Sequence, residues 1–259
     1  AEYSKVGNLV MRTLARTTSS NTRFWQAWDY NEAINRLNET WIVPCFGTGS
    51  LQHLHFAYDD AGNILSLRDE PSDETRQTDV QCFAYDHMRQ LTQAWTPDAT
   101  GEQACQAAPQ VEELGGPAPY WHSYTYDAIG NRVTETQHGG IGGATERTYT
   151  HPAAGQDQPH TLTQVHETGP AGSRLEHYGY DESGNMVSRT TPAHEQELEW
   201  DAEGRLVRVD DAASGVTIYT YDADGARLVR RDATTSTLYL PGMEIHHERT
   251  SLLTRALRC

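Results

Sequence analysis

Five aspartates recur behind an aromatic residue, and paired carboxylates are the groups that glycoside hydrolysis uses. A glycine follows each of them three residues later. Aspartate at the first position of a type I turn accepts backbone N–H bonds two residues on, and glycine supplies the positive φ that ends such a turn. Turn formation therefore explains them without catalysis, and we predict that the chain is not an enzyme. The five are Asp59, Asp127, Asp181, Asp201 and Asp222.

Two groups of histidines offer the nitrogen ligands that metal sites use. In His53-Leu54-His55 two imidazoles share one strand face, and His246-His247-Glu248 combines nitrogen with oxygen. Neither group has an evident third ligand at a diagnostic spacing. We therefore predict no metal-binding residues.

Two glycine-containing segments could suggest a nucleophile or a phosphate loop. Gly47-Thr48-Gly49-Ser50 does not match the G-x-S-x-G nucleophile turn. The glycine-rich residues 139–143 lack the Lys-Ser/Thr of a phosphate loop and indicate a loop between repeats. We predict no catalytic residues, no cofactor-binding residues and no cofactor.

The charge balance excludes some partners. The chain has 36 acidic and 20 basic residues and a net charge of −16, which repels nucleic acid and anionic membrane surfaces. No apolar run approaches the roughly 20 residues that span a bilayer. The first residues lack a basic region followed by an apolar stretch, so we expect no signal peptide in this chain. A mature or excised secreted chain would look the same.

The elements that hold these residues repeat along the chain. Each copy has an aromatic residue, aspartate, two variable residues, glycine, and then an aliphatic residue that follows closely. Copies that begin at Tyr180, Trp200 and Tyr221 give a period of 20 to 21 residues. Other copies begin at Tyr58, Tyr126 and, in degenerate form, Tyr85, with weaker candidates at Trp28 and Tyr149.

Each copy is typical of a β-hairpin. A second aromatic stands two residues before the first, so the pair shares one face of a strand; these residues are Phe56, Phe83, Tyr124, Tyr178 and Tyr219. The aspartate and glycine form the turn, and the aliphatic residue starts the return strand. A lone hairpin is marginal in water, so roughly seven or eight units should pair into a sheet of about 15 strands that curls. The predicted fold is all-β, with repetitive antiparallel β-hairpins in a curling, shell-like sheet.

We divide the chain into three parts. Residues 1–24 form an N-terminal lead-in segment or strand. Residues 25–245 form the repeat sheet, with insertions near 96–120 and 135–175. Residues 246–259 are a divergent or truncated tail that does not continue the pattern.

The recurring Y-D-x-x-G-N/R signature resembles the Rhs/YD-repeat (rearrangement hotspot) family over residues 25–245. Three segments resemble its actinobacterial type: residues 91–97, 115–121 and 238–244. The resemblance implies a hollow β-shell that encloses a C-terminal toxin or effector, which is cut off and held until delivery. The D-P-x-G cleavage motif, the plug segment and a toxin domain are missing from this chain, so we expect a partial repeat region.

The resemblance also bears on the four cysteines, Cys45, Cys82, Cys105 and Cys259. No C-x-x-C pair is present, which argues against a zinc ribbon. Because repeat shells are usually extracellular, we favour a Cys82–Cys105 disulfide over two free thiols. Such a loop would stabilise the fold by roughly 3 kcal/mol.

We therefore expect a scaffold segment of an Rhs/YD-repeat shell, secreted or at the cell surface, that functions in toxin encapsulation or delivery. Its partners would be the rest of the shell or an encapsulated C-terminal effector, with no nucleic acid and no membrane insertion. One alternative is a carbohydrate-binding or adhesive module that stacks sugars on Trp25, Trp28, Trp121 or Trp200. Another is a glycan hydrolase on the same scaffold.

Overall fold

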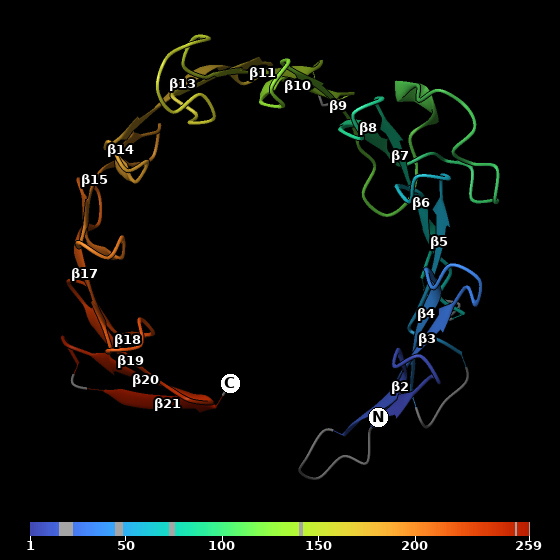
Figure 1. Ribbon diagram of the computed structural model, residues 1–259, viewed down its shortest axis with the longest axis horizontal. Coiled ribbons are helices and arrows are strands. Elements are labelled where there is room, and N and C mark those ends of the chain that lie inside the picture. Colours follow the sequence, from blue (N-terminus) through green and yellow to red (C-terminus); the bar gives the residue numbers. More distant parts are fainter. Residues whose placement is uncertain (16–22, 45–48, 73–75, 140–141, 252, 259) are drawn as a thin grey trace. The chain divides into compact units, whose positions relative to one another are not determined.

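The computed structural model describes residues 1–15, 23–44, 49–72, 76–139, 142–251 and 253–258. These residues form twenty-one strands and one short 3-10 helix, η1 (Val111–Glu113), shown in Figure 1. The all-β prediction is confirmed. Among the residues named above, Cys45, Gly47, Thr48, Gly140, Ile141 and Cys259 lie outside the described part. No described helix is long and apolar enough to cross a membrane.

The chain divides into two compact units, residues 1–146 and 147–259. In the first unit each strand pairs antiparallel with the next one along the chain, from β1 to β10. The strands are β1 (Glu2–Tyr3), β2 (Leu9–Ala15), β3 (Arg23–Tyr30), β4 (Leu37–Pro44), β5 (Gln52–Tyr58), β6 (Ile64–Asp69), β7 (Asp79–Tyr85), β8 (Leu91–Trp95), β9 (Trp121–Tyr126) and β10 (Arg132–His138).

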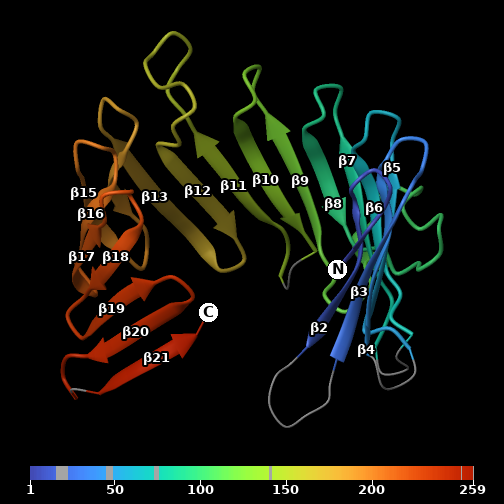
Figure 2. The same cartoon turned by 60° about the horizontal axis from the view of Figure 1, so that its bottom comes forward.

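The second unit repeats this order from β12 to β21, again with neighbours in sequence paired antiparallel (Figure 2). The unit boundary falls within β11 (Thr145–Thr150). The remaining strands are β12 (Gln164–Gly169), β13 (Gly172–Tyr180), β14 (Met186–Thr190), β15 (Glu195–Trp200), β16 (Leu206–Asp211), β17 (Gly215–Tyr221), β18 (Arg227–Arg231), β19 (Thr235–Leu240), β20 (Met243–Glu248) and β21 (Thr254–Arg258).

The described residues hold more strands than the about 15 expected from the repeats. The excess arises because segments without a clear copy of the repeat also form strands: β1 and β2, β11 to the start of β13, and β20 and β21. The division into residues 1–24, 25–245 and 246–259 stays a prediction.

A β-bulge recurs at the same place in the repeat. In six hairpins of the repeat the register shifts just before the key aromatic residue, which marks a β-bulge. The six aromatics are Tyr58, Tyr85, Tyr126, Tyr180, Trp200 and Tyr221. A bulge bends a strand and increases its twist, so a bulge in each hairpin supplies the curvature that Figure 1 shows within each unit.

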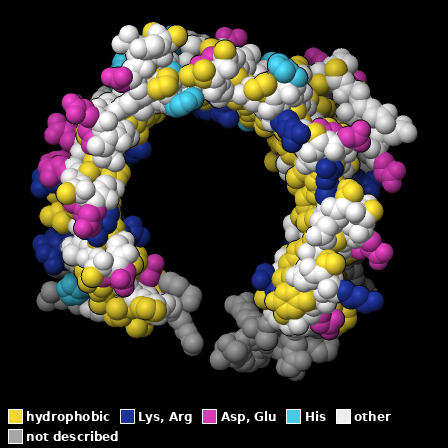
Figure 3. All heavy atoms as spheres, viewed as in Figure 1, with side chains coloured by type: hydrophobic (Ala, Val, Ile, Leu, Met, Phe, Trp, Pro, Cys, Tyr) yellow, Lys and Arg dark blue, Asp and Glu magenta, His cyan; other side chains and the backbone are white. Residues whose placement is uncertain are grey.

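Most of the sheet is a single layer, and few side chains are fully buried. In Figure 3 hydrophobic side chains gather along the concave side of the first unit, and acidic side chains lie mainly on the convex side. The core formed by buried residues is small: Val80, Cys82 and Trp95, with Ala104 and Leu114 packed against it.

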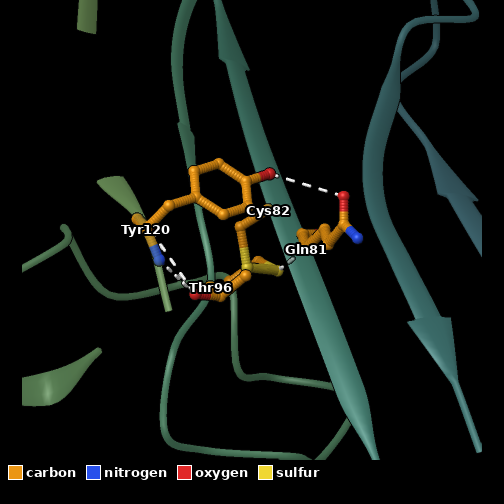
Figure 4. Close-up of a disulfide and its surroundings, with 5 residues drawn as sticks. Gln81, Cys82, Thr96 and Tyr120 are labelled. Atoms are coloured by element: carbon orange, nitrogen blue, oxygen red, sulfur yellow. Dashed lines mark hydrogen bonds between the residues drawn. A yellow bond between two sulfur atoms is a disulfide. The ribbon is translucent and has the colours of Figure 1, made fainter. Parts of the chain in front are cut away.

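The core lies where the disulfide insertion (residues 96–120) covers strands β7 and β8. A disulfide joins Cys82 to Cys105, with a Cα–Cα distance of 5.3 Å, which confirms the predicted bridge (Figure 4). Thr96 closes the base of the insertion: its N–H donates to the carbonyl of Tyr120 at 3.0 Å, and its hydroxyl accepts from the N–H of Tyr120 at 3.0 Å. The insertion thus supplies the second layer that the sheet otherwise lacks.

Candidate functional site

The repeated aspartates form the turns predicted for them. In the third clear copy, Oδ1 of Asp181 accepts from the N–H groups of Ser183 and Asn185, both at 2.9 Å. The N–H of Gly184, whose φ is +84°, donates to the Asp181 carbonyl at 3.0 Å. The sequence predicts this much.

The residue after the glycine adds a contact that the sequence does not reveal. Asn185 Nδ2 donates to the second carboxylate oxygen of Asp181 at 2.9 Å. That bond, with the backbone donors, lowers the pKa of Asp181 from its ordinary value. In the first clear copy the equivalent bond, from Asn63 Nδ2 at 2.7 Å, lowers the pKa of Asp59. At Asp201 an arginine replaces the asparagine, and Arg205 Nε donates to the carboxylate at 2.8 Å.

In five hairpins the key aromatic residue bonds to the hairpin before it. Its hydroxyl or indole N–H donates to the carbonyl of the aliphatic residue that opens the previous return strand. We call this contact the cross-repeat bond. Five instances are Tyr58 to Leu37 (2.8 Å), Tyr85 to Ile64 (2.9 Å), Tyr126 to Leu91 (2.8 Å), Trp200 to Met186 (2.8 Å) and Tyr221 to Leu206 (2.8 Å).

A different cluster lies at the hairpin of β4 and β5. His53 Nε2 is 2.9 Å from one carboxylate oxygen of Glu39, and His55 Nδ1 is 3.2 Å from the other. The two imidazole centroids are 4.0 Å apart. We call Glu39, His53 and His55 the histidine–glutamate cluster. Burial opposes the charged form of Glu39, but the hydrogen bond from His53 and the nearby imidazoles outweigh it, so the pKa of Glu39 is lowered.

The strand register explains why these three side chains meet. His53 and His55 share a face of β5, and Glu39 on β4 stands directly opposite His55. On the other side His55 faces Arg68 of β6, which in turn faces Val80 of β7. The cluster therefore lies on the face that the disulfide insertion covers.

A groove of about 490 Å³ lies beside the cluster. Its floor includes Glu39, His55 and Arg68, and the disulfide insertion contributes Gly101, Glu102 and Cys105.

Residues 114–240 match the family model described as Teneurin YD-shell, and they contain the hairpins of Tyr126, Tyr180, Trp200 and Tyr221. This match, over just under half of the chain, supports a YD-repeat shell family. Its assignment to the actinobacterial type stays a prediction. No curated protein matches the chain in sequence.

Two solved structures resemble the YD-repeat chain in fold. The crystal structure of TcdB2-TccC3-Cdc42 aligns with a TM-score of 0.51 at 14% identity, over 99% of this chain and 17% of the other. The crystal structure of TcdB2-TccC3-TEV aligns with a TM-score of 0.50 at 19% identity, over 96% of this chain and 12% of the other. At these identities the likeness shows the fold alone, and this chain spans less than a fifth of either neighbour.

The second predicted histidine group is not brought together in the YD-repeat sheet. His246 Nε2 lies 3.2 Å from Glu244, whereas His247 Nδ1 lies 2.9 Å from the hydroxyl of Thr254. Adjacent strand residues point to opposite faces. The first group, by contrast, gains Glu39, which sequence reasoning missed because Glu39 lies on another strand.

Three of the four candidate sugar-stacking tryptophans have partners within the YD-repeat sheet. Trp28 has the Arg12 guanidinium 5.5 Å from its ring, Trp121 stacks on His138 at 3.8 Å, and the Trp200 indole N–H makes a cross-repeat bond. Trp25 remains 48% exposed.

Proposed function

We propose that this chain is a wall segment of a YD-repeat shell that encloses or displays a C-terminal toxin or effector. The observation that carries the proposal is the cross-repeat bond, because it ties successive hairpins together within each unit. A wall of this kind needs no catalytic group. The absence of enzymatic activity stays a prediction.

Several features support an extracellular role for this wall. A disulfide is retained in oxidising compartments, and Cys82 and Cys105 form one. The structures similar in fold are named for a third component, Cdc42 in one and TEV in the other. We propose that the partners are the remainder of the shell and an enclosed effector, and that the chain acts in secreted form or at the cell surface.

The test uses the natural open reading frame that contains these 259 residues. The expressed product is treated with protease under native conditions, and the survival of any segment beyond the repeats is followed by mass spectrometry. Encapsulation predicts that such a segment resists cleavage until the shell is unfolded. A segment cut as fast as its isolated form, or an open reading frame with no further segment, would contradict the proposal.

The exposed ring of Trp25 favours a second candidate, a carbohydrate-binding module. A glycan array probed with the wild-type chain and with Trp25→Ala distinguishes the two functions. Strong binding that depends on Trp25 would support the carbohydrate-binding function and contradict a purely structural role. Trp200→Phe is the matched control, because that indole already bonds within the sheet.

A further inference from the structure

The histidine–glutamate cluster has the composition of a metal site. We propose that Glu39, His53 and His55 bind one divalent transition-metal ion of the Zn²⁺ type. Two imidazole nitrogens and one carboxylate oxygen are ligands that such ions accept. Among the described residues this is the one group of three or more potential ligands whose atoms converge, all within 4.8 Å of one another.

The spacing of the ligand atoms fits the ion. In a tetrahedral zinc site with bonds near 2.1 Å, neighbouring ligand atoms stand about 3.4 Å apart. Glu39 Oε2 is 2.9 Å from His53 Nε2, and Glu39 Oε1 is 3.2 Å from His55 Nδ1. One nitrogen of each histidine and one oxygen of Glu39 all lie within 4.8 Å of one another, so side-chain rotation can bring the three around a common centre.

The surroundings of His55 fit a ligand held in place. Ligating histidines usually direct their second ring nitrogen at a carboxylate or a carbonyl. Nε2 of His55 is buried, lies 3.5 Å from Oε2 of Glu70, and makes no hydrogen bond to any described residue. The other carboxylate oxygen of Glu70, Oε1, lies 3.4 Å from Nη1 of Arg68. Glu70 is therefore a positioning residue for His55.

The site is built on the sheet and does not depend on a loop. Two paired strands supply the ligands, and Trp41, the cross-strand neighbour of His53, stacks on it at 5.0 Å. The side chains of His53 and His55 are 24% and 23% exposed, so an ion can reach them. Three protein ligands leave a fourth position, and the adjacent groove has room for water there.

An ion bound here would cross-link β4 to β5, next to the disulfide insertion. Such a cross-link stabilises only the folded chain, so added metal should raise the unfolding temperature.

The test is direct titration of the oxidised 259-residue chain with Zn²⁺ and with Co²⁺, by calorimetry and by absorbance. Cys45→Ser and Cys259→Ser are introduced throughout, because thiols also bind these ions. We expect one equivalent to bind, with a Co²⁺ spectrum typical of nitrogen and oxygen ligands. The variants Glu39→Gln, His53→Asn and His55→Asn should each abolish that binding, whereas Glu70→Gln should weaken it by about 10- to 100-fold.

His246→Asn is the matched control, since it removes an imidazole beside a single glutamate and should leave binding unchanged. Circular dichroism without metal shows that each variant folds. Trp41→Phe should reduce fluorescence quenching by Cu²⁺ without lowering Zn²⁺ affinity. Binding that survives in all three ligand variants, or no saturable binding of either Zn²⁺ or Co²⁺, would overturn the proposal.

Discussion

At the scale of the residue, the recurring carboxylates serve as hydrogen-bond acceptors. Both oxygens of Asp59 and of Asp181 are occupied by donors from the same turn. The Asp222 turn keeps the backbone donors, but Ala226 stands where the others have asparagine or arginine. A carboxylate held in this way is a poor candidate for proton transfer.

These turns make stability depend on acid. The folded-state pKa values of Asp59, Asp127, Asp181 and Asp201 are lowered. Their contribution is therefore complete above the ordinary aspartate pKa, about 3.9, and is lost as the pH falls through the lower folded values. Urea midpoints measured from pH 7 to pH 2.5 should fall over that window. Asp181→Asn should flatten the dependence, and a curve parallel to wild type would contradict this assignment.

The cross-repeat bond predicts a cost for removing one hydroxyl. Tyr85→Phe deletes the donor to the Ile64 carbonyl and keeps the ring, so the free energy of unfolding should fall by about 1 kcal/mol. Urea denaturation measures the change. Tyr3→Phe is the control: Tyr3 is 64% exposed, so loss of its hydroxyl should not change the free energy of unfolding measurably. Equal effects of the two substitutions would remove the energetic role of the bond.

At the scale of the element, each hairpin combines a turn that the sequence predicts with a contact that it does not. The spacing of aspartate and glycine is local, and so is the aromatic pair; Phe56 and Tyr58 do stack, with centroids 6.4 Å apart. The carbonyl that accepts the Tyr126 hydroxyl lies 35 residues away, across an insertion. The sequence likewise does not reveal that Glu39 contacts His55, because only the register of β4 on β5 brings the two together. The turns and hairpins were therefore predictable, whereas the side-chain contacts between residues distant in sequence were not.

The left-handed glycine of the turn gives a clean test of backbone strain. Gly184→Ala places a methyl group where no atom lies within 4 Å, at a φ of +84°, so its cost is conformational and should be about 1 kcal/mol. Gly101→Ala is the matched control, because its methyl group also meets nothing within 4 Å and its φ is not in that region. Thermal unfolding should separate the two, and equal midpoints would contradict the account.

The disulfide insertion should depend on its bridge. Cys105→Ser opens a loop of 23 residues and should lower stability by roughly 3 kcal/mol. Cys82 is fully buried, so the substitution at Cys105 disturbs packing less. Thermal melts with and without reductant check the result: wild type should shift to lower temperature, whereas Cys105→Ser should not respond. Insensitivity of wild type to reductant would show that packing alone holds the insertion.

At the scale of the whole molecule, nearly all pairing is between neighbours in sequence, and strand edges remain. Within the described residues β21 pairs only with β20, and Leu257 on it is 54% exposed. Unpaired edges invite association with another chain, although a net charge of −16 opposes it at low salt.

We therefore expect the 259-residue chain to associate reversibly at physiological salt, and Leu257→Lys to reduce the association. Sedimentation velocity over a range of concentrations measures it. Ile218→Lys is the control, because Ile218 is 45% exposed and pairs with Arg208 of β16 on one side and with Arg231 of β18 on the other. A chain that stays monomeric at every concentration would show that its edges are already protected.

The order of strand pairing also determines how such a chain can fold while it is being made. Because each strand within a unit pairs with the one made just before it, a chain that leaves a ribosome from its N-terminus finds a finished template at each step within that unit. The tyrosine of each new hairpin reaches back to a carbonyl that has already emerged. Folding within each unit can therefore keep pace with synthesis, and the longest wait in the first unit is at β8, whose partner strand β9 begins only after the disulfide insertion.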